Sequence, residues 1–254
     1  MRLKTQPSSF PLHGFTLVEM AVVMMILGLM LGGLFTAIGQ STENKRRTDT
    51  ISQLALVEEA LYGFAQAYGR LPCPSTVVSL GVEDPVGGGA CTVAHGFVPM
   101  VTLGLPNVPS SNGLMLDAWR NPLRYSVSAL VSPTAPNRAF SSAVGLAAQF
   151  PVALTAGAPL FCVGDVAGCT GGGYAGTLFA NTVPALVYSA GQLDYSATSA
   201  DEAENLGGVL GVFAVANDVE FVNRNYTDEI YDDLITWISP ATLYARMVQA
   251  GRLP

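Results

Sequence analysis

The feature that most constrains this chain is an apolar run from Phe15 to Ile38 whose only charged side chain is Glu19. About 20 apolar residues in a helix suffice to cross the hydrocarbon core of a bilayer. Basic residues lie on both sides of the run, at positions 2, 4 and 45–47. The run therefore predicts a single membrane-spanning helix. The Glu19 carboxylate inside this run requires an explanation, because placing a charge at the bilayer centre costs roughly 2.5–3.5 kcal/mol of free energy even on insertion scales.

Two ordinary export signals explain only part of this N-terminus. A secretory signal peptide has an apolar centre of about 7–15 residues and a small-residue cleavage site after it. This run is longer, and no Ala-x-Ala pattern follows Ile38. A plain signal anchor, which keeps basic residues in the cytoplasm, explains the flanking charges. It leaves Gly14 and Glu19 without a role.

The residues Gly14-Phe15-Thr16-Leu17-Val18-Glu19 resemble the processing site of type IV pilins and type II secretion pseudopilins. The resemblance implies that a prepilin peptidase cleaves after Gly14, removes a leader of residues 1–14 and methylates the new N-terminal Phe15. It also implies that Glu19 attracts the N-terminal amine of a neighbouring subunit during assembly. Such a pairing would remove much of the cost of a carboxylate in lipid. His13 departs from the family pattern, in which Lys or Arg is commoner at this position.

The helical pattern continues past the apolar run as an amphipathic segment over residues 39–70. Apart from Glu58, its apolar residues recur at spacings of three and four, which is typical of a helix packed on a sheet. They are Ile51, Leu54, Leu61, Ala65 and Tyr68. No proline lies between Phe15 and Leu71. We therefore expect one helix from about Phe15 to Gly69, ended by the prolines that follow.

Residues 71–254 are rich in small residues, and we expect them to form an exported, globular, β-rich head. Residues 71–122 contain several prolines and three successive glycines, and are expected to be a long connection. The expected strands are residues 123–130, 160–163, 185–189, 209–216 and 219–223, with a turn at Asn217-Asp218 between the last two. The predicted fold class is α+β: a long N-terminal helix, membrane-spanning in its first half, packed on an antiparallel β-sheet head as in pilins.

Two short sequences give local detail in the head. Asp117-Ala118-Trp119-Arg120-Asn121-Pro122 resembles the D-x-W-G-N-P turn that precedes the first sheet strand in pseudopilins. Arg120 replaces its usual glycine, so a different backbone geometry is expected there. Ser239 followed by Pro240 predicts the start of a C-terminal helix, and Gly251 its end. The apolar face of this helix comprises Leu243, Met247 and Ala250.

The four cysteines form two local pairs, Cys73 with Cys91 and Cys162 with Cys169. Two disulfides made in an oxidising compartment are favoured, and of three possible connectivities we expect these two local pairs. A zinc site would require closer cysteine spacing and usually histidine. The only histidine after the leader is His95, which we expect to be a loop residue.

The chain has a net charge of −7, and its carboxylates concentrate between residues 194 and 233. This balance argues against nucleic-acid binding, which needs clustered Lys and Arg. The clustered carboxylates make calcium a candidate cofactor, because calcium takes six to eight oxygen ligands. Some pseudopilins bind calcium in a C-terminal loop. This chain does not match that loop, and a solvated acidic surface is the alternative. The candidate ligands are Asp228, Glu229, Asp232 and Asp233, and a second acidic cluster comprises Asp201, Glu202 and Glu204.

Neither a phosphate-binding loop nor a nucleophile elbow occurs in the sequence, so we do not expect an enzyme. The resemblance favours a minor type IV pilin with a priming, tip or adhesive role, because the chain left after removal of the leader is large for an abundant pilin. Its expected partners are the prepilin peptidase, other pilin subunits and an inner-membrane assembly platform. Before assembly we expect a single-pass inner-membrane protein with a cytoplasmic N-terminus and a periplasmic head. The alternatives are a pseudopilin of a type II secretion system and, in a different class, a membrane-anchored periplasmic binding protein or hydrolase.

Overall fold

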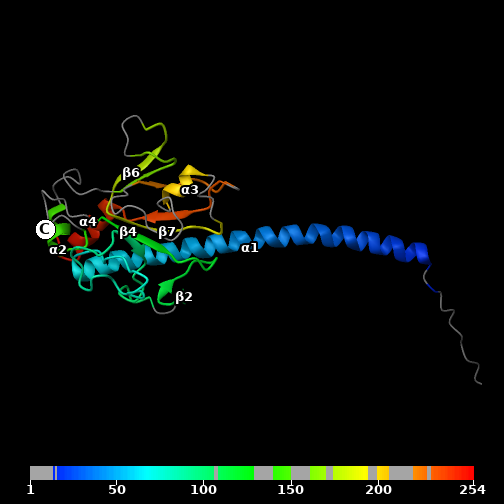
Figure 1. Cartoon of the computed structure of the whole chain (residues 1–254), viewed down its shortest axis with the longest axis horizontal. Coiled ribbons are helices and arrows are strands. Elements are labelled where there is room, and N and C mark those ends of the chain that lie inside the picture. Colours follow the sequence, from blue (N-terminus) through cyan, green and yellow to red (C-terminus); the bar gives the residue numbers. More distant parts are fainter. Residues whose placement is uncertain are drawn as a thin grey trace, which may run out of the picture. The chain divides into compact units, whose positions relative to one another are not determined.

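The computed structural model describes residues 14, 16–105, 108–128, 140–149, 161–169, 174–193, 199–205, 220–227 and 230–254, with the side chains of residues 31–40 and 148–149 left aside. The chain divides into two compact units, Met1–Lys45 and Arg46–Pro254. The helices and strands are α1 (Leu17–Tyr68), β1 (His95–Phe97), β2 (Ser110–Ser111), β3 (Leu114–Met115), β4 (Arg124–Val127), α2 (Ala143–Gln149), β5 (Phe161–Gly164), β6 (Leu178–Val183), β7 (Ala185–Ser189), α3 (Ala200–Asn205), β8 (Glu220–Val222), β9 (Leu234–Trp237) and α4 (Pro240–Gln249) (Figure 1).

Helix α1 contributes residues to both units. It extends from Leu17 to Tyr68, within two residues of the predicted ends, in a stretch without proline. Gly69 follows in the left-handed region, with a φ of 74°, and its N–H donates to the carbonyl of Ala65 at 2.8 Å. Glycine adopts this conformation without a steric penalty and so ends the helix.

The second unit is built on a four-stranded antiparallel sheet in the order β1-β4-β7-β9. Strand β7 has the predicted bounds. Strand β4 is shorter than the predicted strand 123–130, whose last two residues lie outside the described part of the chain. All five residues of β7 are buried. This central strand is therefore covered on both faces, which its apolar sequence Ala-Leu-Val-Tyr-Ser allows.

One face of the four-stranded sheet packs against helices. Tyr125, Val127 and Val187 belong to the same core cluster as the buried residues of α1 and α4. The α1 members are Leu54, Val57, Leu61, Tyr62 and Ala65. The central residues of the predicted apolar stripe are therefore buried as expected. Ile51 and Tyr68, at its two ends, are 54% and 61% exposed.

The other face is covered by a second sheet of three strands, in the order β6-β5-β8 (Figure 1). Leu186 and Tyr188 pack there against Phe161, Val163 and Phe221. Strands β5 and β6 are antiparallel, whereas β5 and β8 are parallel. The predicted antiparallel sheet is present, and the β5–β8 pair is a parallel exception to it. Residues 206–219, with the predicted strand 209–216 and its turn, lie outside the described residues.

The expected long connection over residues 71–122 contains strands. Strand β1 forms an edge of the main sheet, and β2 and β3 form a separate hairpin. Gly96 lies at the centre of β1, where an added Cβ would come within 2.6 Å of the carbonyl oxygen of Ser75. A three-residue strand with a central glycine has no recognisable alternation, so its strand character arises from pairing with β4. His95 is accordingly a buried strand residue and not the expected loop residue.

The turn over residues 117–122 is held by the side chain of Asp117. Asp117 Oδ1 accepts hydrogen bonds from the backbone N–H groups of Trp119 and Asn121 at 2.9 and 2.8 Å. Its Oδ2 accepts from the Ser189 hydroxyl at 2.6 Å, which ties the turn to the end of β7. Arg120 adopts a φ of 74°, in the left-handed region that favours glycine. The expectation of a different backbone geometry at this position stays a prediction.

Helix α4 begins and ends where the sequence predicts. The Ser239 hydroxyl accepts from the N–H of Thr242 at 3.4 Å, and Gly251 has a φ of 68°. Leu243 and Met247 are buried, but Ala250, the third residue of the predicted apolar face, is exposed.

The C-terminal segment also fastens α1 to the head. The Ser239 N–H donates to the Tyr62 hydroxyl at 2.9 Å. Arg246 forms a bidentate ion pair with Glu59, both contacts at 2.7 Å, and its guanidinium lies 4.4 Å from the centre of the Tyr62 ring. Arg252 donates to the carbonyl of Gln66 at 3.0 Å. The C-terminal segment therefore supplies strand β9 and a clamp on α1, formed by Ser239, Arg246 and Arg252.

Candidate functional site

The predicted processing site lies at the start of α1. Gly14 is exposed and belongs to no helix or strand, and Phe15 lies outside the described residues. Among the described residues, no atom lies within 4 Å of where a Cβ on Gly14 would stand.

Glu19 has a partner within its own chain that the sequence analysis missed. The backbone N–H of Glu19 donates to the Thr16 hydroxyl at 3.2 Å, and the N–H of Thr16 donates to Glu19 Oε2 at 3.5 Å. This reciprocal arrangement is a capping box, which satisfies two backbone donors at a helix start. The signal was present in the sequence as Thr-x-x-Glu ahead of an apolar run. Glu19 therefore helps to begin the helix, whatever its role in assembly.

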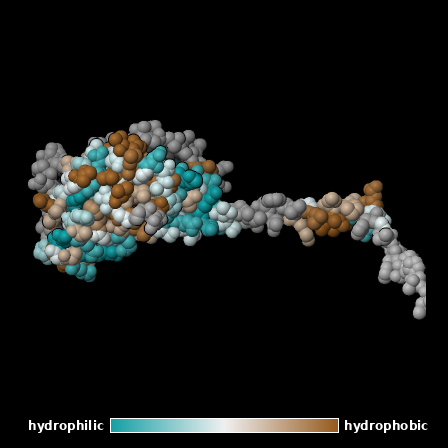
Figure 2. Space-filling view, turned by 90° about the horizontal axis from the view of Figure 1, so that it is seen from below, coloured by the Kyte–Doolittle hydropathy of each residue, from teal (hydrophilic) through white to brown (hydrophobic). Residues whose placement is uncertain are grey.

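The described side chains of α1 between Leu17 and Met30 present an apolar surface. Large apolar side chains between Leu17 and Met30 are 42% to 88% exposed (Figure 2). They are Leu17, Val18, Met20, Val22, Val23, Met24, Met25, Ile26, Leu27, Leu29 and Met30. They point in all directions around the helix, since they occupy nearly every successive position. A helix that is apolar on all sides needs an apolar environment.

A search of the described residues finds no helix with both the length and the apolarity required to span a membrane. The predicted span 15–38 includes Phe15 and side chains from residue 31 onward that the structure does not describe.

Both cysteine pairs form disulfides. Cys73 is bonded to Cys91 and Cys162 to Cys169, with Cα–Cα distances of 5.4 and 6.2 Å. All four cysteines are used, so none offers a thiolate to zinc.

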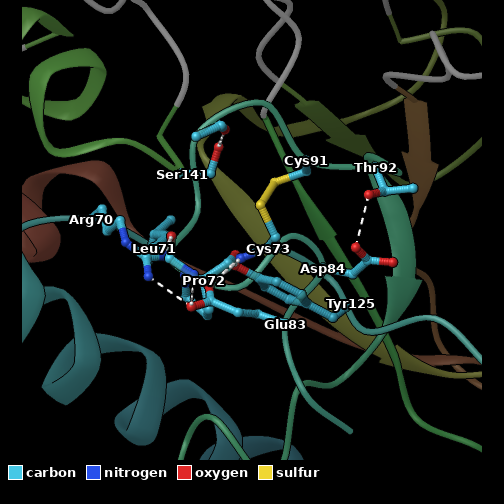
Figure 3. The surroundings of a disulfide bond; sticks show 12 residues. Arg70, Leu71, Pro72, Cys73, Glu83, Asp84, Cys91, Thr92, Tyr125 and Ser141 are labelled. Atoms are coloured by element: carbon cyan, nitrogen blue, oxygen red, sulfur yellow. Dashed lines mark hydrogen bonds and ion pairs between the residues drawn. A yellow bond between two sulfur atoms is a disulfide. The ribbon is translucent and has the colours of Figure 1, made fainter. Parts of the chain in front are cut away.

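A buried ion pair lies directly beside the first disulfide, where α1 leads into the head (Figure 3). The two guanidinium nitrogens of Arg70 each contact one Glu83 oxygen at 2.7 Å. The backbone N–H of Cys73 also donates to Glu83 Oε2 at 3.2 Å, and that of Gly87 to Oε1 at 3.1 Å. Burial raises the pKa of Glu83, but these hydrogen bonds and the charge of Arg70 outweigh it and lower the pKa below 4.5. Glu83 therefore holds the disulfide segment and the helix end together.

The structure separates the acidic residues that the sequence grouped into two clusters. Asp228 and Glu229 lie outside the described residues. Asp232 and Asp233 are buried, and Glu202 of α3 lies beside them. These three do not form the solvated acidic surface considered as the alternative to a calcium site. Asp201 instead pairs with Arg224 and accepts from the N–H of Ala167 at 3.1 Å, which holds the loop of the second disulfide.

A histidine–serine pair is present but inaccessible. His95 Nδ1 lies 2.9 Å from the Ser126 hydroxyl, and both side chains are buried. The imidazole packs against the rings of Phe161 and Phe221, at centroid distances of 5.7 and 6.1 Å. With 0% of Ser126 exposed, its hydroxyl cannot meet a substrate in this structure. The pair serves packing between the two sheets.

Comparison with known proteins identifies the N-terminal segment. A family model described as the prokaryotic N-terminal methylation motif matches residues 13–35. No curated protein and no solved structure matches the chain. The matched segment contains Gly14, the capping box and the exposed apolar turns of α1. This chain therefore carries the N-terminal methylation motif that is the hallmark of type IV pilins and pseudopilins.

Proposed function

We propose that this chain is a minor type IV pilin, a non-enzymatic subunit that enters a surface fibre in low copy number. The observation that carries the proposal is the methylation motif at residues 13–35, which includes helical turns with exposed apolar side chains. Such turns suit first a bilayer and then a bundle of like helices. The proposal includes cleavage after Gly14, methylation of Phe15, and transfer from the inner membrane into the fibre by an assembly platform.

Glu19 supports the assembly step through its chemistry. A carboxylate near the start of an apolar helix is costly in lipid, and pairing with the N-terminal ammonium of a neighbouring subunit reduces that cost. The subunit would therefore be drawn from the membrane toward the growing fibre. The capping box does not compete with this role, because a carboxylate accepts several hydrogen bonds.

The low copy number is inferred from charge and size. The head carries most of the carboxylates of a chain with a net charge of −7. Like charges repeated at every position of a fibre repel one another. A head at the tip, or at sparse intervals along the fibre, avoids this repulsion. A hydrolase anchored in the membrane is disfavoured by the burial of Ser126 beside His95.

Quantitative mass spectrometry of fibres sheared from the cell surface tests the proposal. We expect this chain in the fibre fraction at a small fraction of the abundance of the main subunit. Its presence as the dominant subunit would contradict the minor role. Its absence from surface fibres, together with recovery from the periplasmic face of the envelope, would favour a pseudopilin of a type II secretion system.

A further inference from the structure

Three carboxylates from distant parts of the sequence meet inside the head. Glu202 comes from α3, and Asp232 and Asp233 directly precede β9. They are 0%, 4% and 2% exposed. One carboxylate oxygen from each lies within 4.8 Å of the others. Three acidic side chains are not normally gathered in the interior of a protein, since each charge loses its hydration.

Each carboxylate is held by one of its two oxygens. Asp232 Oδ2 accepts from the backbone N–H groups of Gln192 and Leu193 at 2.8 and 2.9 Å. Asp233 Oδ2 accepts from the Asn205 side-chain amide at 2.7 Å. Glu202 Oε2 accepts from the N–H of Asp232 at 3.3 Å. These donors fix the orientation of the three groups, as outer hydrogen bonds do for the ligands of metal sites.

The remaining oxygens of two of these groups are buried without a hydrogen-bond partner. They are Oε1 of Glu202 and Oδ1 of Asp232, as judged within the described part of the chain. The ion pairs found among the described residues involve neither Glu202 nor Asp232. A buried carboxylate oxygen without a donor is unfavourable by more than an ordinary lost hydrogen bond. A ligand with positive charge would satisfy both atoms at once.

The electrostatics of the cluster agree with this geometry. Three carboxylates whose oxygens lie within 4.8 Å of one another repel when all are ionised, and a cation between them would offset that repulsion. Arg47 adds positive potential at Asp232, but its guanidinium lies over the Tyr226 ring, 4.6 Å from the ring centre.

We propose that Glu202, Asp232 and Asp233 bind one hard divalent cation, and that calcium is the ion preferred. The ligand atoms are all carboxylate oxygens, which suit calcium or magnesium, whereas zinc and copper favour nitrogen and sulfur. Magnesium usually keeps several waters, and a cluster this deeply buried leaves little room for them. Calcium accepts an irregular set of carboxylate and carbonyl oxygens, so it fits the site better. The ion would link α3 to the strand β9 that closes the main sheet.

The proposal is independent of the proposed function and is tested on the full chain purified in detergent and treated with EDTA. The melting temperature of the head is measured while CaCl₂ or MgCl₂ is added. At a hundredfold excess over Kd, we expect calcium to raise the Tm by roughly 5–10 °C, and magnesium to raise it less. A Tm that responds to neither ion would overturn the proposal, and a larger response to magnesium would overturn the preference for calcium.

Two variants in the same helix locate the ion. Glu202→Gln preserves the side-chain shape but removes a ligand charge, and should abolish the response to calcium. Glu204→Gln, the matched control on α3, lies outside the cluster and should retain the response. An equal calcium response in Glu202→Gln would place the ion elsewhere and contradict the proposal. A Glu202→Gln protein that is more stable than the unmodified chain, with no calcium response in either, would show a proton-sharing cluster and also contradict it.

A second measurement needs no variant, in case Glu202→Gln does not fold. Equilibrium dialysis of the unmodified chain against CaCl₂, followed by elemental analysis, should give one tightly bound calcium per chain that EDTA removes. Binding of no calcium at millimolar concentration would overturn the proposal.

Discussion

At the residue scale, Glu19 joins two kinds of chemistry in one side chain. Within its own chain it completes a capping box with Thr16, and in the proposed fibre its charge pairs with the amine of a neighbouring subunit. A capping box requires an acceptor, which glutamine also supplies, whereas the pairing requires a negative charge. The two roles can therefore be separated by substitution.

We expect Glu19→Gln and Glu19→Ala to be processed normally but to enter fibres poorly, at less than about a tenth of the normal level if pairing contributes about 1.4 kcal/mol or more. Glutamine preserves the cap, so a defect in both variants would be due to the lost charge. The measurement is the ratio of this chain in sheared fibres to that in the membrane fraction. Normal incorporation of Glu19→Gln beside a defect in Glu19→Ala would assign the effect to helix capping and refute the pairing.

The buried pair Arg70–Glu83 and the exposed pair Arg246–Glu59 provide a matched comparison. Glu83→Gln leaves the Arg70 charge buried and unpaired, and should lower the free energy of unfolding by about 3–5 kcal/mol. Glu59→Gln, at a side chain that is 63% exposed, should lower it by at most about 1 kcal/mol. Urea unfolding of the full chain in detergent, followed by near-UV circular dichroism, measures both. Equal losses would show that burial does not distinguish the two pairs.

The same pair predicts a dependence on pH. The pKa of Glu83 in the folded chain lies below its ordinary value of 4.5, so the unfolded chain takes up this proton first as pH falls. The free energy of unfolding therefore decreases as pH falls from about 4.5 through the folded-state pKa, and is unaffected by this group above that window. The acid-induced loss should be smaller in Glu83→Gln. An unchanged pH profile in this variant would contradict the assignment.

Some single residues could not be interpreted from the sequence because their roles depend on distant contacts. Glu202 is 30 residues from Asp232, and only the fold brings their carboxylates together. The hydrogen bond from Ser189 to Asp117, which ties the 117–122 turn to the end of β7, joins residues 72 positions apart and has no sign in the sequence. The capping role of Glu19, in contrast, was readable from Thr16 three residues earlier.

At the scale of elements, the features predicted correctly are those with local causes. Helices α1 and α4 follow from periodicity and from their end residues, and the bounds of β7 follow from a continuous apolar run. Strands β1, β2 and β3 have two or three residues each and no pattern of their own. The pairing of β5 with β8 joins segments more than fifty residues apart. Pairing between distant segments, and not local preference, creates these strands.

The two disulfides should contribute unequally to the stability of the head. They close loops with sequence separations of 18 and 7, for which chain entropy gives about 3 and about 2 kcal/mol. Replacing Cys73 and Cys91 together by alanine should therefore destabilise the head more than replacing Cys162 and Cys169. Urea unfolding of the two double variants is the measurement, and the opposite order would contradict this account.

At the scale of the whole molecule, the α+β class was predictable because the composition changes at the end of α1. A proline-free helical pattern gives way there to a segment rich in proline, glycine and other small residues. The three layers within residues 46–254 were not, since β7 must be buried on both faces before a second sheet is implied. The same holds for the C-terminal clamp on α1, which depends on contacts between residues about 180 positions apart.

The central claim is that the chain is processed as a pilin, and the mass of its mature N-terminal peptide tests this most directly. We expect the peptide to begin at Phe15 and to carry one methyl group. Gly14→Val should retain residues 1–14, whereas Gly28→Val, the matched control, should be processed. Among the described residues an added Cβ meets no atom within 4 Å at either position, so the two changes are comparable in steric effect. A chain that keeps Met1 in cells with an active prepilin peptidase would contradict the account.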